Sequence, residues 1–407
     1  MSASAAAPPS REVRRARGAV AALFLTNGAL FANLVPRFPE IKADLGLDNA
    51  AYGVAIAAFP AGAILAGLAS GTLLRRIGSG RAAVLGTILT AIGTVVAGVS
   101  PTLLAFAAAL LVSGATDAVT DVAQNTHGLR VQRRFGRSLI NSFHALWSIG
   151  AVLGGAMAAG AIAVGLPRST HLVLSGTLFA IVALTALRFC LPGRDDAERP
   201  ERTSTGPRSS VKGRVVLLLV ALVGVAIAGT LVEDAASTWA AVYLSGELGA
   251  TAAVAATGFV ALVGAQFVGR ILGDRLVDRF GQRAVVRTGG AIALLGMGAA
   301  LLLPSVPGTI LGFAAAGLGL ATTVPAAMHE ADEIPGLRAG TGVTLVSWLM
   351  RLGFLLSPPL VGLVSDSAGL RAGLAVVPLA GLLAVVLAPA LTARRRTGSA
   401  SANGVAA

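Results

Sequence analysis

The sequence has little of what soluble enzymes and metal proteins depend on. Its 407 residues include one cysteine and four histidines, and only 13% are charged and 5% aromatic. The single cysteine, Cys190, excludes a disulfide or a thiolate metal cluster within the chain. The histidines lack metal-ligand spacing and there is no Walker-type phosphate loop. We therefore expect no metal, no cofactor and no enzymatic activity.

What the sequence has in abundance is long apolar stretches. Hydrophobic residues make up 55% of the chain, and the mean hydropathy is +0.79. Each stretch has roughly 20 residues, which as an α-helix crosses about 30 Å of hydrocarbon. Helices satisfy their own backbone hydrogen bonds, so they are the expected spanning element. We predict an all-α membrane protein with about twelve transmembrane helices, at residues 18–36, 51–74, 82–99, 102–127, 139–164, 170–191, 214–244, 252–273, 285–303, 306–328, 340–363 and 370–391.

Positive charge is unevenly placed between these stretches. The formal net charge is +13, but the arginines form short clusters rather than one basic face, so no nucleic-acid partner is expected. Most Lys and Arg residues fall in every second loop and in the tails, whereas the other loops hold only Arg37, Lys42, Arg168 and Arg371. By the positive-inside rule, both termini are expected to be cytoplasmic.

A polar, charged segment divides the chain in the middle. Residues 193–213 read GRDDAERPERTSTGPRSSVKG and are expected to be a cytoplasmic linker. The linker separates an N-terminal bundle (18–192) from a C-terminal bundle (214–391), each with about six helices. The tails, 1–17 and 392–407, are expected to be disordered.

The two bundles share traces of an internal repeat. A shift of 203 residues places Arg76 and Gly78 on Arg279 and Gly281. The same shift places Gly150 on Gly353. We therefore predict two pseudo-symmetric halves with a binding site between them.

Two segments carry a resemblance to a known family. Residues 71–81 (GTLLRRIGSGR) and 273–283 (GDRLVDRFGQR) resemble the Gly-x-Leu-x-Asp-Arg-x-Gly loops of the major facilitator superfamily. The first copy departs from the pattern because Arg75 takes the acidic position, whereas the second keeps an aspartate. The resemblance implies that superfamily's fold and a gating role for residues in and beside these loops, which are Arg76, Gly78, Asp278 and Arg279.

One further pair lies close to the second of these loops. Arg270 and Asp274 are four residues apart near the end of the eighth span. We expect them to form an ion pair at the same gate. Contact with the substrate is the alternative.

Other segments are similar to the fucose-permease-like branch of the superfamily, at residues 117–125, 142–155, 233–244 and 269–276. The resemblance implies a monomeric, proton-coupled secondary transporter in a bacterial inner membrane. It would move a small solute by alternating access, with sugar-like or organic-acid symport favoured. A proton-coupled efflux antiporter and a membrane sensor that does not translocate its ligand are the alternatives.

Ionisable residues inside the spans are the candidate functional groups. Asp117, Asp121 and Asn125 recur every four residues and share one helix face. A carboxylate near the bilayer centre costs at least about 2.5–3.5 kcal/mol, so these groups are expected to face a watery cavity or a partner. We expect the two aspartates to carry protons and Asn125 to contact substrate. A hydrogen-bond cluster that only holds helices together is the alternative.

The fifth span adds a second polar face. Asn141, His144 and Ser148 lie on it, with Trp147 beside them. Since histidine titrates near neutral pH, His144 is predicted to form a proton relay with one of the two aspartates. The alternative is a neutral histidine that donates to a backbone carbonyl. Asn141 and Trp147 are expected to contact substrate.

In the seventh span, Glu233 and Asp234 are adjacent, so their side chains point about 100° apart and only one is expected to face the cavity. Resemblance to the branch favours Glu233 as the protonatable group, with Asp234 on the substrate side. Trp239 and Tyr243 would either stack on a sugar or form an aromatic belt. Arg351, in the eleventh span, needs a carboxylate or a bound anion.

Three polar or aromatic residues within spans complete the predicted substrate site. They are Asn27, Gln266 and Trp348. Each of them is equally explained by packing between helices.

Overall fold

A computed structural model describes residues 10–136, 139–193, 213–334, 337 and 341–392. Within these ranges the ordered elements are helices, and twelve of them are long and apolar enough to cross a membrane. The predicted fold class and span number are therefore confirmed. Residues 194–212, which make up most of the expected linker, lie outside the described ranges.

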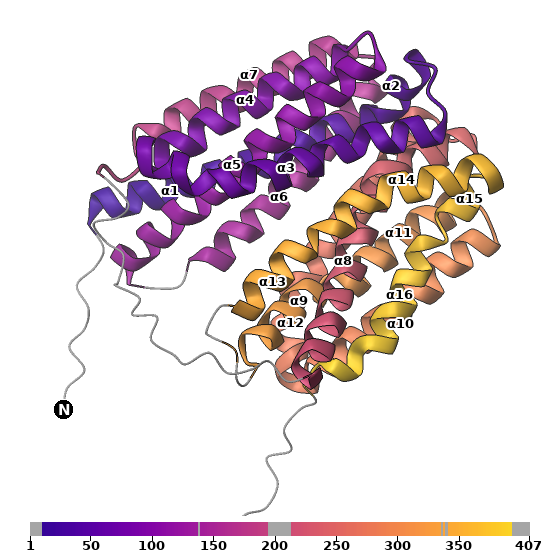
Figure 1. Cartoon of the computed structure of the whole chain (residues 1–407). Helices are drawn as coiled ribbons and strands as arrows, with labels where there is room; N and C mark the ends of the chain where they lie inside the picture. Colours follow the sequence, from indigo (N-terminus) through magenta and orange to yellow (C-terminus); the bar gives the residue numbers. More distant parts are fainter. Residues whose placement is uncertain (1–9, 137–138, 194–212, 335–336, 338–340, 393–407) are drawn as a thin grey trace, which may run out of the picture.

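The helices form two bundles, which Figure 1 shows one above the other. The first half contains α1 (Arg11–Leu34), η1 (Val35–Arg37), α2 (Phe38–Asp44), α3 (Asn49–Ile77), α4 (Ser79–Val99), α5 (Leu103–Phe135), α6 (Ile140–Ala163) and α7 (Arg168–Leu187). The second half contains α8 (Gly213–Gly246), α9 (Ala252–Phe280), α10 (Gln282–Leu302), α11 (Val306–Leu320), α12 (Thr323–Asp332), α13 (Thr341–Leu349), α14 (Arg351–Ala368), α15 (Leu370–Gly373), α16 (Val376–Leu387) and η3 (Ala388–Ala390).

The predicted repeat is visible in the backbone. Gly78 and Gly281, which the 203-residue shift equates, end α3 and α9 with φ of 82° and 83°. Glycine is the residue that takes this left-handed region without strain. Gly150 brings α6 against α1, where an added Cβ would collide with the carbonyl of Leu25. Its equivalent Gly353 lies where α14 packs against α8, and an added Cβ there would collide with the Thr230 hydroxyl, so a close helix contact is found at the equivalent position as well.

The helix boundaries differ from the prediction at the start of α1 and at the end of α5. Residues 11–17, expected to belong to a disordered tail, are helical, because α1 begins at Arg11, where the Ser10 hydroxyl accepts a hydrogen bond from the Val13 amide (3.3 Å). The fourth span continues as helix to Phe135 and ends at Gly136, whose φ is 72°. Hydropathy alone does not detect such extensions, because arginines outside the membrane are good helix formers.

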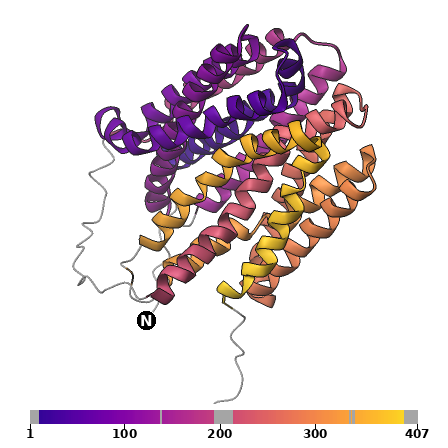
Figure 2. The same cartoon turned by 45° about the vertical axis from the view of Figure 1, so that its right-hand side comes forward.

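The two halves touch mainly at one end of the molecule, which we call the closed end. There α3 and α14 cross so tightly that a Cβ on Gly53 would collide with the carbonyl of Pro358. The Tyr52 hydroxyl also donates to the Thr238 carbonyl of the other half (2.9 Å). Toward the opposite end, where residues 193 and 213 lie and which we call the linker end, the halves diverge (Figures 1 and 2).

A carboxylate completes the contact at the closed end. Asp366 on α14 accepts hydrogen bonds from the backbone amides of Asn49 (3.0 Å) and Ala50 (2.8 Å). These amides belong to the first turn of α3, whose own cap is Asp48, which accepts from the Ala51 amide (2.7 Å). The second half thus supplies a charged cap to a helix of the first half.

We expect Asp366→Ala to favour opening of the closed end. Losing a capping carboxylate costs about 1 kcal/mol, which corresponds to a roughly fivefold change in the ratio of two conformations. Distances between spin labels on α3 and α14, measured across the closed end, would report this change. Asp48→Ala is the matched control, because it removes a cap of the same helix from within the first half. An equal shift in both variants would contradict the role of the Asp366 contact.

Candidate functional site

A cavity of about 310 Å³ lies between the two halves, midway along the helices. Both halves contribute charged residues to it, and aromatic rings form much of its wall. The polar and charged lining residues are Asn27, Asp117, Trp147, Glu233, Asp234, Ser237, Thr238 and Arg351. Its charged residues, Asp117, Glu233, Asp234 and Arg351, are all among the candidates that the sequence analysis named.

Asp117 is held by residues from three helices. The Asn27 amide Nδ2 donates to Asp117 Oδ1 (2.6 Å). The Asn27 oxygen in turn accepts from Trp147 Nε1 (2.9 Å) and from Gln124 Nε2 (3.3 Å). With donors on its oxygen and a carboxylate on its nitrogen, the Asn27 amide has one possible orientation. This network connects α1, α5 and α6 at the wall of the cavity.

One turn along α5, a second chain of polar groups leads toward the linker end. Asp121 Oδ1 accepts from the Asn125 amide (2.9 Å), and the Asn125 oxygen lies 3.1 Å from His144 Nε2. Asp117, Asp121 and Asn125 thus share the predicted face, but only Asp117 lines the cavity. The expected direct pair between His144 and an aspartate is replaced by a contact through Asn125, because the Asn125 side chain fills the space between α5 and α6.

In the second half, Glu233 is the best-connected carboxylate. Its Oε2 accepts from Gln266 Nε2 (2.7 Å) and lies 3.5 Å from Arg270 Nη2. Arg270 also reaches the first half, where Nη1 donates to the Ser148 hydroxyl (3.4 Å). The predicted partner of Arg270 was Asp274, whose side chain lies outside the described part of the chain. The structure instead places this arginine at the cavity carboxylate.

Asp234 also lines the cavity, so the expectation that only one of the two adjacent acids faces it is wrong. The cavity wraps around this part of α8, and a 100° offset is small enough for both side chains to border it. Among the described residues, no group hydrogen-bonds to the buried Asp234 Oδ2. A buried, ionised carboxylate without a partner is costly, so this oxygen is suited to carrying a proton.

Arg351 begins α14 at a break in the eleventh span. The span is divided at Met350, whose carbonyl accepts from the Thr230 hydroxyl (3.0 Å). From this position the guanidinium interacts electrostatically with Asp117 and Asp121 of the opposite half. The predicted pairing with the acids of α8 is thus replaced by attraction across the interface.

Several predicted residues lie away from the cavity. Trp348 does not line it and is 50% exposed. Trp239 and Tyr243 are fully buried, and Trp239 packs edge-on against Tyr52 with ring centroids 5.0 Å apart. Neither ring stacks on a cavity ligand or forms a belt, because both fill the core of the closed end. The Asn141 side chain lies outside the described part of the chain.

The predicted gate residues are found at the linker end. Arg76 and Gly78 line a second pocket, within the first half. Asp278 is exposed and forms no ion pair with any described residue, and Arg279 packs on the Phe280 ring (5.3 Å). The gating role of these residues stays a prediction.

Sequence reasoning missed the phenylalanines that line the cavity, which include Phe31, Phe59, Phe259 and Phe354. Phe31 follows Asn27 by one helical turn, so extending the polar face of the first span would have found it. The other three carry no polar signal in their neighbourhood. No group of His, Cys, Asp and Glu in the described ranges is arranged to hold a metal.

We expect Asn27→Ala to destabilise the first half by about 1–3 kcal/mol, because it leaves buried partners without a hydrogen bond. Unfolding in a denaturing detergent would measure the loss. Asn33→Ala is the matched control, since Asn33 is a buried amide of the same helix that bonds to the Ala29 carbonyl and to His171. Both variants should lose stability, but only Asn27→Ala should shift the tryptophan emission. A similar shift in both would contradict the link to Trp147.

Comparison with known proteins agrees with this architecture. The chain is 31% identical over 372 residues to an uncharacterized transporter of Sinorhizobium fredii, y4wD, which covers 91% of this chain and 97% of that protein. Among solved structures, the nucleoside transporter NupG matches with a TM-score of 0.71 at 13% identity, over 94% of this chain and 98% of NupG. A D-xylose–proton symporter matches with a TM-score of 0.70 at 14% identity, over 93% and 96%.

The family model of the Major Facilitator Superfamily matches residues 20–329 and 231–407, which together include nearly the whole chain. The fold, the repeated halves and the cavity between them have the arrangement that this family requires. The chain is a multi-pass membrane protein with bacterial homologues. Its substrate is a small molecule that it transports, and it is not an enzyme. It belongs to the Major Facilitator Superfamily of transporters.

Proposed function

We propose that the protein moves a small solute across the bacterial inner membrane by alternating access, driven by protons. The observation that carries this proposal is the cavity at the junction of the halves, with protonatable groups from both of them. Asp117 belongs to the first half, and Glu233 and Asp234 belong to the second. A rocking motion of one half against the other would change the surroundings of these groups together.

The direction in which the cavity faces follows from two features. The halves are in contact at the closed end and diverge toward the linker end. Arginine clusters are concentrated at the linker end, which by the positive-inside rule is the cytoplasmic side. We therefore infer that both termini are cytoplasmic and that this conformation faces inward.

Asp117 and Glu233 are the groups we assign to proton coupling. Each accepts a hydrogen bond from a side-chain amide, Asn27 for Asp117 and Gln266 for Glu233. An amide N–H can donate to an ionised carboxylate and equally to the carbonyl oxygen of a protonated one, so the hydrogen bond is compatible with both states. Each carboxylate also has a cation in its surroundings. Arg351 lies in the half opposite to Asp117, so a rocking motion would separate the two. Arg270 lies in the same half as Glu233, but it also donates to Ser148 of the first half, a contact that the same motion would break. Asp121 and His144 extend this system toward the cytoplasm.

The solute we favour is a small sugar-like molecule or an organic acid. A volume of about 310 Å³ is at the lower end of the range for ligand cavities. Aromatic walls suit the apolar face of a sugar ring, whereas Arg351 suits a carboxylate. Similarity of fold to the D-xylose–proton symporter is compatible with this choice, as is the resemblance of four segments to the fucose-permease-like branch. We propose that the unit of transport is a monomer, because each chain contains the whole cavity.

A second candidate function is proton-coupled efflux of a cation. It is favoured by the excess of acids in the lining, where Asp117, Glu233 and Asp234 face one arginine. The direction of transport under a pH gradient separates the two candidates. Inward accumulation from an acidic outer side supports symport, and expulsion supports efflux.

The experiment has two steps. Thermal-shift screening of the purified protein against sugars, organic acids and cationic drugs should first reveal a stabilising solute. Uptake into proteoliposomes should then depend on an imposed pH gradient. Asp117→Asn and Glu233→Gln should each abolish gradient-driven accumulation while keeping solute exchange at equal pH, because a neutral amide cannot release a proton.

Asp44→Asn is the control for that experiment, because Asp44 pairs with Arg168 (2.8 Å) outside the cavity. It should keep accumulation close to the level of the unchanged chain. Full gradient-driven accumulation by both cavity variants would refute the assignment of proton coupling. If a solute binds but no flux occurs in either direction, the protein is a sensor that does not translocate its ligand.

A further inference from the structure

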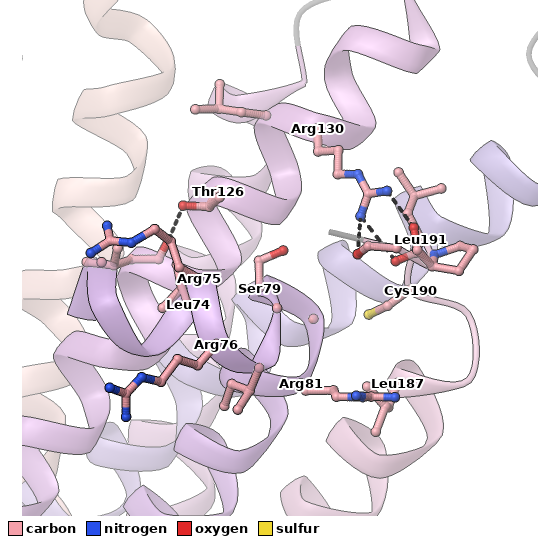
Figure 3. A pocket seen from close by; sticks show the side chains of 18 of the residues that line it. Leu74, Arg75, Arg76, Ser79, Arg81, Thr126, Arg130, Leu187, Cys190 and Leu191 are labelled. Carbon is pink, nitrogen blue, oxygen red and sulfur yellow. Dashed lines mark hydrogen bonds between the residues drawn. The ribbon is translucent and has the colours of Figure 1, made fainter. Parts of the chain in front are cut away.

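A second pocket, larger than the central cavity, lies apart from it. It has a volume of about 950 Å³ and lies within the first half at the linker end, between the ends of α3, α5 and α7 and the start of α4 (Figure 3). Its charged lining residues are all arginines, which are Arg75, Arg76, Arg81, Arg130, Arg133 and Arg188. No aspartate or glutamate lines the pocket within the described ranges.

Most of these arginines are not neutralised by the part of the chain that the structure describes. No ion pair of the described residues involves Arg75, Arg76, Arg81, Arg133 or Arg188. Clustered cations repel one another unless an anion is close, and guanidinium groups match the oxygens of a phosphate in geometry. The arrangement therefore favours an anionic occupant.

The floor of the pocket is rigid. Arg130, which is 3% exposed, donates to the carbonyls of Leu191 (3.4 Å), Pro192 and Gly193 (3.2 Å). His127 is 1% exposed, and its Nε2 accepts from the Leu191 amide (3.0 Å). These contacts attach the segment after α7 to α5. The pocket is thus shaped before any ligand arrives.

The start of α4 adds backbone donors to the same site. Gly78 takes the N-cap position without a side chain that could cap, and the first turn contains no acidic residue. Ser79 and Gly80 of this turn line the pocket, and Figure 3 shows Ser79 between the arginines of α3 and Arg130 of α5. The positive dipole end of α4 favours an anion here, in addition to the arginines.

The second half provides an internal comparison. The 203-residue shift places Arg75, His127 and Arg130 on Asp278, Glu330 and Glu333. Glu330 closes its own half in the same way as His127, since Oε2 accepts from the Thr392 amide (3.0 Å). The backbone arrangement is therefore repeated, but the charge is not. Where the second half has an acidic residue at each of these three positions, the first half has two arginines and a histidine. The packing of the helices alone does not require this difference in charge between the two halves.

We propose that this basic pocket is a phosphate-binding site, supplied by the headgroup of an anionic phospholipid from the adjacent leaflet. Its apolar residues, Leu74, Ile77, Val122, Leu129, Leu187 and Leu191, provide a surface for the glycerol and the first part of an acyl chain. The arginine-rich end is also where an anionic leaflet would lie if the termini are cytoplasmic. A soluble phosphate compound has the same binding chemistry and is the other source to be tested.

The test measures the melting temperature of the full chain in neutral detergent with added phosphatidylglycerol, phosphatidylcholine or inorganic phosphate, and the apparent affinity for each. Phosphatidylglycerol should stabilise the protein and phosphatidylcholine should not. The triple variant R75Q/R81Q/R133Q should lose at least about tenfold in affinity for phosphatidylglycerol. The matched control R275Q/R279Q/R287Q removes the same charge from the second half and should keep the affinity. Stabilisation by inorganic phosphate at least equal to that by the lipid would assign the site to soluble phosphate.

Three results would overturn the proposal. The first is that neither phosphatidylglycerol nor phosphate stabilises the protein. The second is an equal loss of affinity in the two triple variants, which would mean that net charge alone attracts the lipid. The third is that phosphatidylglycerol stabilises a D195N/D196N variant but not the unchanged chain. This result would mean that the carboxylates of Asp195 and Asp196, rather than a phosphate, are the anions that the basic pocket binds. If the triple variant does not fold, Arg81→Gln alone should show a smaller loss in the same direction, and an unchanged affinity would also overturn the proposal.

Discussion

Charge inside a membrane must be kept away from hydrocarbon, and the arrangement of this protein follows from that requirement. Asp117, Glu233, Asp234 and Arg351 all border one cavity between the halves. None of these groups could face lipid without a cost of several kcal/mol. Bringing them together gives Asp117, Glu233 and Arg351 oppositely charged or hydrogen-bonding neighbours. The interface between the halves is therefore the one place within the bilayer where these groups are tolerated.

At the same interface, the two halves must be able to separate at one end of the molecule while they stay in contact at the other. Small residues such as Gly53 and Gly362 let α3 and α14 touch at the closed end, where larger side chains would hold them apart. The polar contacts there are few, and Asp366 reaches backbone amides that water could equally satisfy. Contacts of this kind are specific in geometry but modest in energy. They suit an interface that must exist in two states of similar free energy.

The two halves share a backbone but differ in charge. Gly78 and Gly281 end equivalent helices with the same geometry, and Gly150 and Gly353 make equivalent close contacts. At the linker end, however, Arg75 stands where its counterpart is Asp278. A duplicated scaffold tolerates such replacement because exposed side chains do not determine the packing of the helices. The first half is thus free to develop an anion site that the second half lacks.

The sequence by itself determined the span number, the two halves, the repeat and most of the charged residues of the cavity. Apolar length and the cost of buried charge are local properties, and they identify Asp117, Glu233 and Arg351 without reference to any partner. Only the tertiary structure decided which groups meet. Asn125 lies between Asp121 and His144, Arg270 lies beside Glu233, and Trp239 packs in the closed end. The sequence could not predict these contacts, because they depend on how helices far apart in the chain are rotated against each other. Helical periodicity gives the face of a residue, but the neighbour across that face is set by packing.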